Sequence, residues 1–485
     1  MTFTSFSFLL FVFLLLPLYY TVPKKWQWIL LLAASYAFYL RAGMAYLSYI
    51  LFTTCTTYGA ARMMDHSCGS GDRKAVKKKN RIWLGLCLAA NFALLAVCKI
   101  RFALENSALP LGISFYSFQS MGYVLDVYRG TAGAEKDPLK LALYVSFFPQ
   151  LIQGPISKFS RLAPQLFSPH PYDGKQVSFG LQRMLWGYFK KLVIADRIAV
   201  AVAALKAPEY TGASFLVLTV FYAVQIYGDF TGGIDIAIGF SEALGIRLTE
   251  NFIRPFFSRN TAEYWRRWHI SLGAWMKDYI FYPVSVSGPM RRLSKTARAR
   301  FGRFGKRPPV YAASAATWFV TGIWHGLTPN FILWGMLNCF VIVVSEELSP
   351  LYTKFHNRFH LRQKQWYGAF EMLRTFFLMN LIRIADLFPN VEEYFRRIGT
   401  LFASFRIPFM ELGLTGLDYI ILLAGAVLML TVSIIQERCG SVRELLWNGN
   451  PILRYVLTFV LFLVVLLMGS YGIGYDAGNF IYNQF

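Results

Sequence analysis

Residues 311–345 form an apolar run with a histidine near its middle. At about 1.5 Å of rise per helical residue, the run is longer than the roughly 20 residues that a bilayer core requires. His325 lies between Gly322 and Gly326, and Pro329 follows. Glycine and proline interrupt helices, so the run is predicted to form two helical pieces that meet at a break. An ionisable side chain in lipid usually faces a cavity, unless it is a hydrogen-bonded core residue.

The composition is that of a polytopic membrane protein. Hydrophobic residues make up 55 % of the 485 and aromatic residues 17 %, and the mean hydropathy is +0.41, all outside the ordinary soluble range. The formal charge of +23 is concentrated in loops, which indicates positively charged cytoplasmic loops rather than binding to nucleic acid. No lysine or arginine precedes the apolar segment 4–20, so we interpret it as a retained first span and not as a signal sequence.

The hydropathy pattern predicts an all-α fold of membrane spans. The basic loops 62–81 and 290–309 are expected in the cytoplasm, which places the N-terminus outside after three spans. The segments 109–129 and 139–155 have mixed polarity or prolines and are predicted to be buried or re-entrant. Residues 156–178 are expected to be a polar loop and 349–368 a polar connector. The predicted spans are 4–22, 26–40, 43–61, 82–100, 179–204, 212–240, 311–345, 370–388, 414–435 and 452–470.

Metal and disulfide chemistry are not supported by the sequence. The six cysteines show no CxxC spacing, and the six histidines form no HExxH pattern. We therefore expect no metal site and no tightly bound cofactor.

Two further segments carry polar residues that need an explanation. Asp229 and Asp235 lie in a predicted span and should face the protein interior, as structural carboxylates hydrogen-bonded to a neighbouring helix end or, in the less favoured alternative, with a direct catalytic role. Residues 260–282 are predicted to form one interfacial or re-entrant amphipathic helix, capped by Asn260. Tryptophans and other apolar residues recur along it at three- and four-residue steps, and His269 lies at the edge of this stripe.

His269 and His325 are the candidates for chemistry. They stand 56 residues apart, and each follows a tryptophan. Histidine suits general-base catalysis near neutral pH, and transfer of an acyl group to a hydroxyl needs little more than a positioned base in a desolvated tunnel. The sequence holds no serine in a GxSxG motif, which favours direct attack by the acceptor hydroxyl over a covalent acyl-enzyme. Both histidines remain open to the alternative that they are hydrogen-bonded core residues.

Several motifs together resemble one family. They are Trp-Arg-Arg-Trp-His-Ile-Ser-Leu (265–272), Gly-Ile-Trp-His-Gly (322–326), Asn-Phe-Ile-Leu-Trp-Gly (330–335), Phe-Pro-Gln-Leu-Ile-Gln-Gly-Pro (148–155) and the ending Phe-Ile-Tyr-Asn-Gln-Phe (480–485). With them the chain resembles the membrane-bound O-acyltransferase family. Within it, the similarity is to the bacterial branch of alginate O-acetyltransferase membrane subunits and D-alanyl transfer proteins of teichoic acid synthesis.

The resemblance implies one membrane domain over 1–485, with about eleven helices around a central funnel or tunnel. N-terminal helices would cover 1–100, a catalytic core 109–345 and C-terminal helices 366–485. It implies that His325 is the essential histidine of the family's Trp-His-Gly motif and that His269 corresponds to the histidine of its Trp-Arg-Trp-His type motif. It also suggests that Trp324, Trp268, Asp229, Gln150 and Asn330 line the substrate tunnel.

These expectations combine into one hypothesis. The protein would reside in the cytoplasmic membrane and move an acyl group, acetyl in the first instance, from a cytoplasmic acyl-CoA or acyl-carrier thioester. The acceptor would be a hydroxyl of an extracytoplasmic envelope polysaccharide, or an extracytoplasmic acetyltransferase partner. One rival is D-alanyl transfer to teichoic acid. Another is a transporter or flippase of an acyl donor, in which the histidines relay protons.

Overall fold

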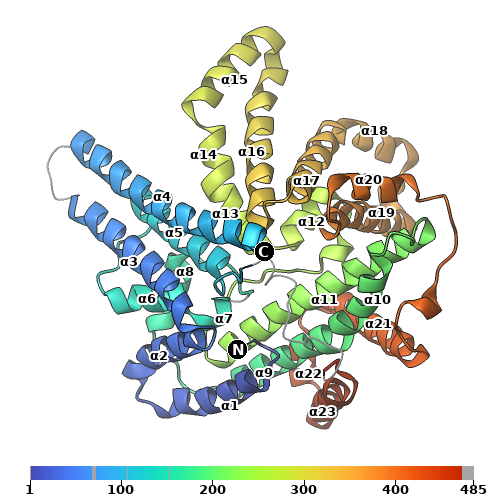
Figure 1. The fold of residues 1–485 in the computed structure, drawn as a ribbon, viewed down its shortest axis with the longest axis horizontal. Coiled ribbons are helices and arrows are strands. Elements are labelled where there is room, and N and C mark those ends of the chain that lie inside the picture. Colours follow the sequence, from blue (N-terminus) through green and yellow to red (C-terminus); the bar gives the residue numbers. More distant parts are fainter. Residues whose placement is uncertain (1, 68–72, 106, 152, 472–485) are drawn as a thin grey trace. The chain divides into compact units, whose positions relative to one another are not determined.

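The computed structural model describes residues 2–67, 73–105, 107–151 and 153–471 (Figure 1). Across these residues the chain is helical, and the β-structure consists of one isolated bridge between Phe252 and Trp268. Five helices are long and apolar enough to cross a membrane: α4 (Arg73–Glu105), α11 (Ala213–Ala243), α17 (Pro329–Glu347), α21 (Gly416–Cys439) and α23 (Pro451–Met468). The all-α membrane fold is thus confirmed, whereas the number of eleven membrane helices stays a prediction.

The described residues divide into two compact units. The first comprises those of Met1–Asp196, Ile226–Thr249 and Ile434–Phe485, and the second those of Arg197–Gln225 and Glu250–Ser433. α11 passes from the second unit into the first. The C-terminal motif 480–485 and Cys68 lie outside the described residues.

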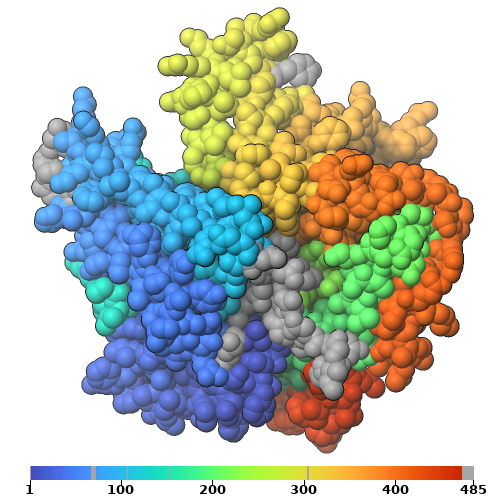
Figure 2. All heavy atoms as spheres, viewed as in Figure 1, coloured from blue at the N-terminus to red at the C-terminus, as the bar shows by residue number. Residues whose placement is uncertain are grey.

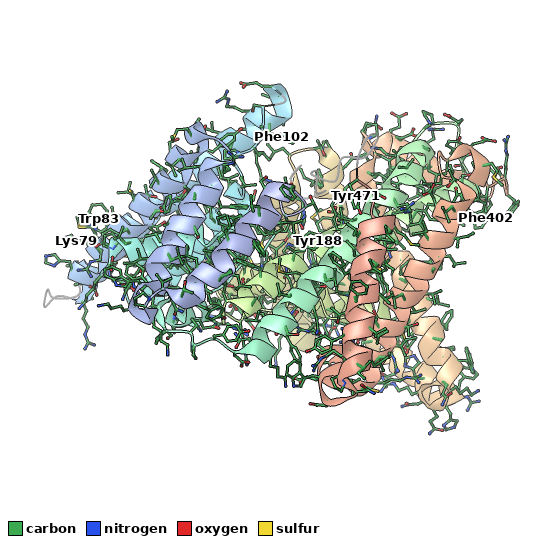
Figure 3. The ribbon with its side chains drawn as sticks, turned by 90° about the horizontal axis from the view of Figure 1, so that it is seen from below. Lys79, Trp83, Phe102, Tyr188, Phe402 and Tyr471 are labelled. Atoms are coloured by element: carbon green, nitrogen blue, oxygen red, sulfur yellow. The ribbon has the colours of Figure 1, made fainter. Side chains whose placement is uncertain are left out.

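The first unit begins with α1 (Phe6–Thr21), α2 (Gln27–Leu40) and α3 (Met44–Ser67), close to the predicted spans. The prediction of a loop over 62–81 is wrong for most of these residues, because α3 continues to Ser67 and α4 starts at Arg73. Basic residues at 73–81 instead occupy the first turns of α4, where lysine and arginine are good helix formers. Figure 3 shows Lys79 toward the start of α4 and Phe102 toward its other end.

The mixed-polarity segments are buried in the first unit, as predicted. Nearly every side chain of α5 (Ile113–Arg129) is buried, including Ser117 and Gln119. Residues 139–155 form α6 (Pro138–Ser146) and the short α7 (Phe148–Leu151), which confirms an interrupted segment. The predicted loop 156–178 instead contains α8 (Phe159–Phe167), whose apolar side packs on the unit while polar side chains point outward. The unit also includes α9 (Gly174–Tyr188), the π-helical segment Phe189–Ala195, α22 (Val442–Asn448) and α23.

The second unit contains the elements that hold both candidate histidines. The predicted loop 290–309 is helical, since α15 (Gly288–Phe301) and a 3-10 segment (Gly302–Lys306) fill it. Figure 2 shows α15 as the yellow surface beside α16 (Arg307–His325). The predicted connector 349–368 contains α18 (Ser349–Phe359), which precedes α19 (Gln365–Arg383). The remaining helices are α10 (Asp196–Leu205), α12 (Thr261–Arg267), α13 (Ile270–Met276), α14 (Tyr282–Ser285), α20 (Val391–Gly399) and α21.

The apolar run 311–345 breaks directly after His325, as the glycine and proline pattern predicted. The two pieces do not form one interrupted span, however: α16 and α17 fold back on each other as an antiparallel hairpin. At the far end of the hairpin, Arg307 and Tyr311 of α16 both bond to the carboxylate of Glu347. Each helix has 19 residues, so each is about as long as a bilayer core is thick.

Glycine permits the close approach of α16 and α17. A Cβ atom added at Gly335 would lie 2.4 Å from the carbonyl oxygen of Trp318, and one at Gly322 would lie 2.6 Å from that of Phe331. These distances are below van der Waals contact with backbone atoms, which cannot move without displacing a helix. The close packing of α16 against α17 therefore depends on the absence of side chains at Gly322 and Gly335.

We expect Gly335→Ala to destabilise the protein by about 1–3 kcal/mol, the usual cost of overpacking a core. Gly85→Ala on α4 is the matched control, because nothing lies within 4 Å of its added Cβ and alanine favours the helix. The thermal unfolding of both variants in detergent measures the difference. Equal midpoints for the two variants would contradict the close packing of the hairpin.

Candidate active site

His325 is the last residue of α16 and is buried. The chain leaves the helix at Gly326, whose position leaves no room for a side chain because the Phe331 ring lies against it. The imidazole packs edge-on against two indoles, with ring centroids 4.9 Å from Trp324 and 4.8 Å from Trp334. The helix end and the first turns of α17 thus enclose this imidazole in aromatic rings.

His269 lies at a break that the sequence did not predict. The amphipathic stripe indicated one continuous helix over 260–282, but α12 ends at Arg267 and α13 begins at Ile270. Between them His269 has the left-handed backbone conformation, with φ of 47° and ψ of 51°. Such a conformation costs a non-glycine residue roughly 1–2 kcal/mol, so its surroundings must hold it in place. The prediction that Asn260 caps the first helix is confirmed by its 2.9 Å bond from the Glu263 N–H.

An extended segment preceding α12 stabilises this break. The Ile253 N–H donates to the carbonyl of Arg267 at 2.9 Å, and the Ile270 N–H donates to that of Asn251 at 3.0 Å. The Asn251 side chain also accepts bonds from both the N–H and the hydroxyl of Ser271, each at 2.9 Å. These bonds satisfy backbone groups that a helix interruption would otherwise leave open.

The structure brings both histidines to the same indole. The His269 ring lies 6.0 Å from that of Trp324, which also contacts His325. Trp268 stacks on Tyr264 at 5.6 Å and contacts Phe252 at 4.9 Å. Two histidines distant in sequence therefore share one aromatic enclosure in the second unit.

Arg383 is the residue of this site that the sequence analysis missed. It is the last residue of α19, and it is buried, with its guanidinium 4.9 Å from the Trp268 ring and 5.3 Å from the Trp334 ring. Its carboxylate neighbour Asp386 lies 3.9 Å away and accepts a 2.9 Å bond from the Tyr222 hydroxyl. An arginine inside the predicted span 370–388 was the available signal, since charges in apolar segments are rarely incidental.

His269 is held in its neutral form. It lies outside the five helices that qualify as spans, and burial, with the nearby positive charge of Arg383, lowers its pKa to about 3. A neutral imidazole has one N–H donor and one acceptor nitrogen, so it can donate to an oxygen that gains negative charge.

The other predicted site residues have identifiable contacts. Asn330, at the start of α17, donates to the carbonyls of Ala385 at 3.1 Å and Phe388 at 2.7 Å. It therefore fixes the α17 start to the segment that follows Arg383. Its Oδ1 is buried and makes no hydrogen bond within the described residues.

Asp229 and Gln150 belong to the first unit. Asp229 forms an ion pair of 2.6 Å with Lys191, which also contacts Asp196 at 2.7 Å. Asp235 likewise pairs with Lys190 at 2.6 Å, so both carboxylates have the partners that their location requires. Gln150 donates to the carbonyl of Pro155 at 2.7 Å and thereby folds the chain after α7. These contacts support a structural role, and a role in substrate binding stays a prediction for both residues.

Comparison with known proteins identifies a family over the region that contains this site. Residues 129–385, which include both histidines and Arg383, match the family model described as MBOAT, membrane-bound O-acyltransferase family. The chain belongs to the membrane-bound O-acyltransferase family. This identification confirms the resemblance expected from the motifs, and with the apolar helices it makes the protein a multi-pass membrane protein.

The similar curated proteins are named as O-acetylases, O-acetyltransferases or D-alanyltransferases. A probable alginate O-acetylase of Pseudomonas fluorescens is 34 % identical over 338 residues, covering 68 % of this chain and 64 % of that protein. The peptidoglycan O-acetyltransferase of Helicobacter pylori is 28 % identical over 438 residues, or 78 % of each chain. The teichoic acid D-alanyltransferase of Bacillus subtilis is 26 % identical over 234 residues, or 47 % of this chain and 56 % of that protein. The chain thus spans slightly less than two thirds of the Pseudomonas fluorescens relative.

The low pKa of His269 predicts an acid-dependent loss of stability. Unfolding exposes the imidazole and restores a pKa near 6.5, so below that pH the unfolded state binds a proton that the folded state excludes. This effect leaves the free energy of unfolding unchanged above about pH 6.5. Below that pH it lowers the free energy of unfolding, by about 2 kcal/mol at pH 5.

His269→Asn tests this prediction, because asparagine accepts the left-handed conformation but does not titrate. The wild type should lose more thermal stability than the variant between pH 7 and pH 5. An equal loss in both proteins would contradict a neutral, buried His269.

Proposed function

We propose that this protein transfers an acetyl group from a thioester donor to a hydroxyl of an envelope polysaccharide. The observation that carries the proposal is the shared enclosure of His269 and His325 around Trp324, within the region that matches the family. Acetyl is favoured over D-alanyl because the relatives named O-acetylase or O-acetyltransferase align over more of the chain than the D-alanyltransferase does.

His325 acts as the general base in this proposal. Its imidazole removes the proton of the acceptor hydroxyl while the hydroxyl oxygen attacks the thioester carbonyl carbon. A carbon–oxygen bond forms, the carbon–sulfur bond breaks, and the departing thiolate takes the proton from the imidazolium. The surrounding indoles exclude water, which would otherwise compete with the acceptor for the acyl group.

His269 and Arg383 stabilise negative charge in the same step. The thioester oxygen becomes an oxyanion as the acceptor attacks, and a neutral imidazole can donate a hydrogen bond to it. Burial, together with the guanidinium of Arg383, keeps His269 neutral, and the guanidinium adds a positive field. Its contacts with Trp268 and Trp334 hold it in one position without requiring a bound anion.

The donor is proposed to approach from the cytoplasm. Arg291, Arg292 and Lys295 are exposed on α15, and the segment 290–309 contains no acidic residue. Positive charge of this kind marks cytoplasmic segments and attracts an acyl-CoA or an acidic acyl carrier. On this topology the protein lies in the cytoplasmic membrane, the N-terminus is outside, and an envelope polysaccharide or an extracytoplasmic acetyltransferase partner receives the acetyl group.

We expect His325→Ala to lower acyl transfer by roughly 10²- to 10⁴-fold, the usual contribution of a general base. Ester-linked acetate released by mild base from the envelope glycans of a rescued deletion strain, measured by mass spectrometry, reports the transfer. His66→Ala, which changes an exposed histidine at the end of α3, is the control. Full transfer by a normally inserted His325→Ala would contradict the proposed role.

The same measurement, together with an assay of the purified protein, separates the rival functions. D-alanine in place of acetate would identify the protein as a D-alanyltransferase. A flippase would carry the donor across the membrane but would form no ester in detergent with purified donor and acceptor. Ester formation by the purified protein therefore excludes a purely transporting role.

A further inference from the structure

A cavity lies in the second unit, among α12, α17, α18 and α19. Its volume is about 970 Å³, which is at the upper end of the range for small-molecule sites. The lining includes Glu346 at the end of α17, Tyr352 and His356 on α18, and Tyr367 and Glu371 on α19. None of the residues proposed for acyl transfer contributes to it.

The cavity carries positive charge that the protein does not neutralise. Arg259, Arg362, Lys364 and Arg374 line it. The side chains of the first three make no ion pair or hydrogen bond within the described parts of the chain, and Arg374 donates to the backbone carbonyl of Arg259 at 2.8 Å. The Arg259 guanidinium lies close to Gly368 of α19, since a Cβ atom added at Gly368 would be 3.5 Å from its Cζ.

The cavity has fewer acidic than basic residues, and some of the acidic ones already have partners within the protein. Glu263 accepts the Arg259 N–H at 2.9 Å and pairs with Arg267 at 2.8 Å, so its charge is already balanced. Glu371 lies 3.9 Å from the His356 ring, which contacts the Tyr367 hydroxyl at 2.9 Å. Glu346 is thus the acidic group without a partner among the described residues. The site as a whole favours an anion.

Large apolar side chains border the cavity and are exposed. Phe340 of α17 and Tyr352 of α18 line it, and both are substantially exposed. Trp366 and Phe370, next to lining residues of α19, are 60 % and 49 % exposed. A small soluble anion would leave this apolar border uncovered, whereas the chains of a lipid would cover it.

The position of the cavity agrees with a membrane surface. It lies at the end of the α16–α17 hairpin where Arg307 meets Glu347, and the basic helix α15 leads into that end. The cytoplasmic leaflet contains anionic lipids, and basic pockets between helices on that side bind their headgroups.

We propose that this cavity binds the phosphate-bearing headgroup of an anionic phospholipid. Arg259, Arg362 and Lys364 contact the phosphate, and the acyl chains run along the exposed side of α17 past Phe340. The His356–Tyr367 pair supplies polar groups for the remainder of the headgroup. Inorganic phosphate shares the anionic chemistry but not the apolar contact, so it binds more weakly.

Native mass spectrometry of the purified protein in detergent tests the proposal with dihexanoyl-phosphatidylglycerol as the probe and dihexanoyl-phosphatidylcholine as the neutral comparison. We expect retention of the anionic lipid, and a loss of about 30-fold in affinity for the double variant Arg362→Ala/Lys364→Ala. Lys354→Ala/Arg358→Ala is the matched control. It removes the same charge from exposed positions of α18 that do not line the cavity, and it should bind within about threefold of the wild type.

Three results would overturn the proposal: equal affinity for both lipids, equal losses in the two double variants, or displacement of the lipid by an equal concentration of inorganic phosphate. If Arg362→Ala/Lys364→Ala fails to fold, the lipid affinity of the Glu346→Gln variant tests the proposal instead. Removal of this negative charge should tighten binding about fivefold, and an unchanged affinity would contradict the site. No acyl donor is present, so the outcome is independent of the acyl-transfer proposal.

Discussion

A buried guanidinium between two indoles is the interaction on which the rest of the site depends. Arg383 ends α19, Trp268 follows α12, and Trp334 belongs to α17, so this one side chain joins three helices that are separate in sequence. A charge without partners in an apolar interior would be strongly destabilising. The contacts with the rings and with Asp386 offset that cost, and they fix the charge beside His269.

Two interruptions of helical structure deliver the histidines to one place. His325 occupies the end of a helix, because Gly326 takes an extended backbone conformation and Pro329 starts the next helix. His269 occupies a left-handed position between two short helices, stabilised by the bonds of Asn251. The left-handed backbone at His269 is consistent with a site whose geometry matters more than local stability.

Much of the fold could be predicted from the sequence, for identifiable physical reasons. Hydropathy located the long helices, and the glycine and proline pattern located the break after His325. The antiparallel return of α17 could not be predicted, because it depends on the contact of Gly335 with the Trp318 backbone. The charge of the basic segments 62–81 and 290–309 indicates loops, yet lysine and arginine favour helices when neighbouring helices support them.

The site was predicted in part. Both histidines and Trp324 were identified from motifs, and the structure brings these three together. The break at His269 was missed because the apolar stripe of 260–282 fits a continuous helix, and only the distant Asn251 segment interrupts it. Arg383 was missed although the logic applied to Asp229, a charge within an apolar span, applies equally to it.

The central claim is that His269 and His325 act as one catalytic unit around Trp324. A double-mutant cycle tests it most directly, with ester formation by purified His325→Ala, His269→Asn and the combined variant measured on the same donor and acceptor. Substitutions of residues that act in one step have strongly non-additive effects on the rate. The combined variant should therefore be no slower than the slower single variant. Losses that simply multiply would show that the two histidines act independently and would contradict the claim.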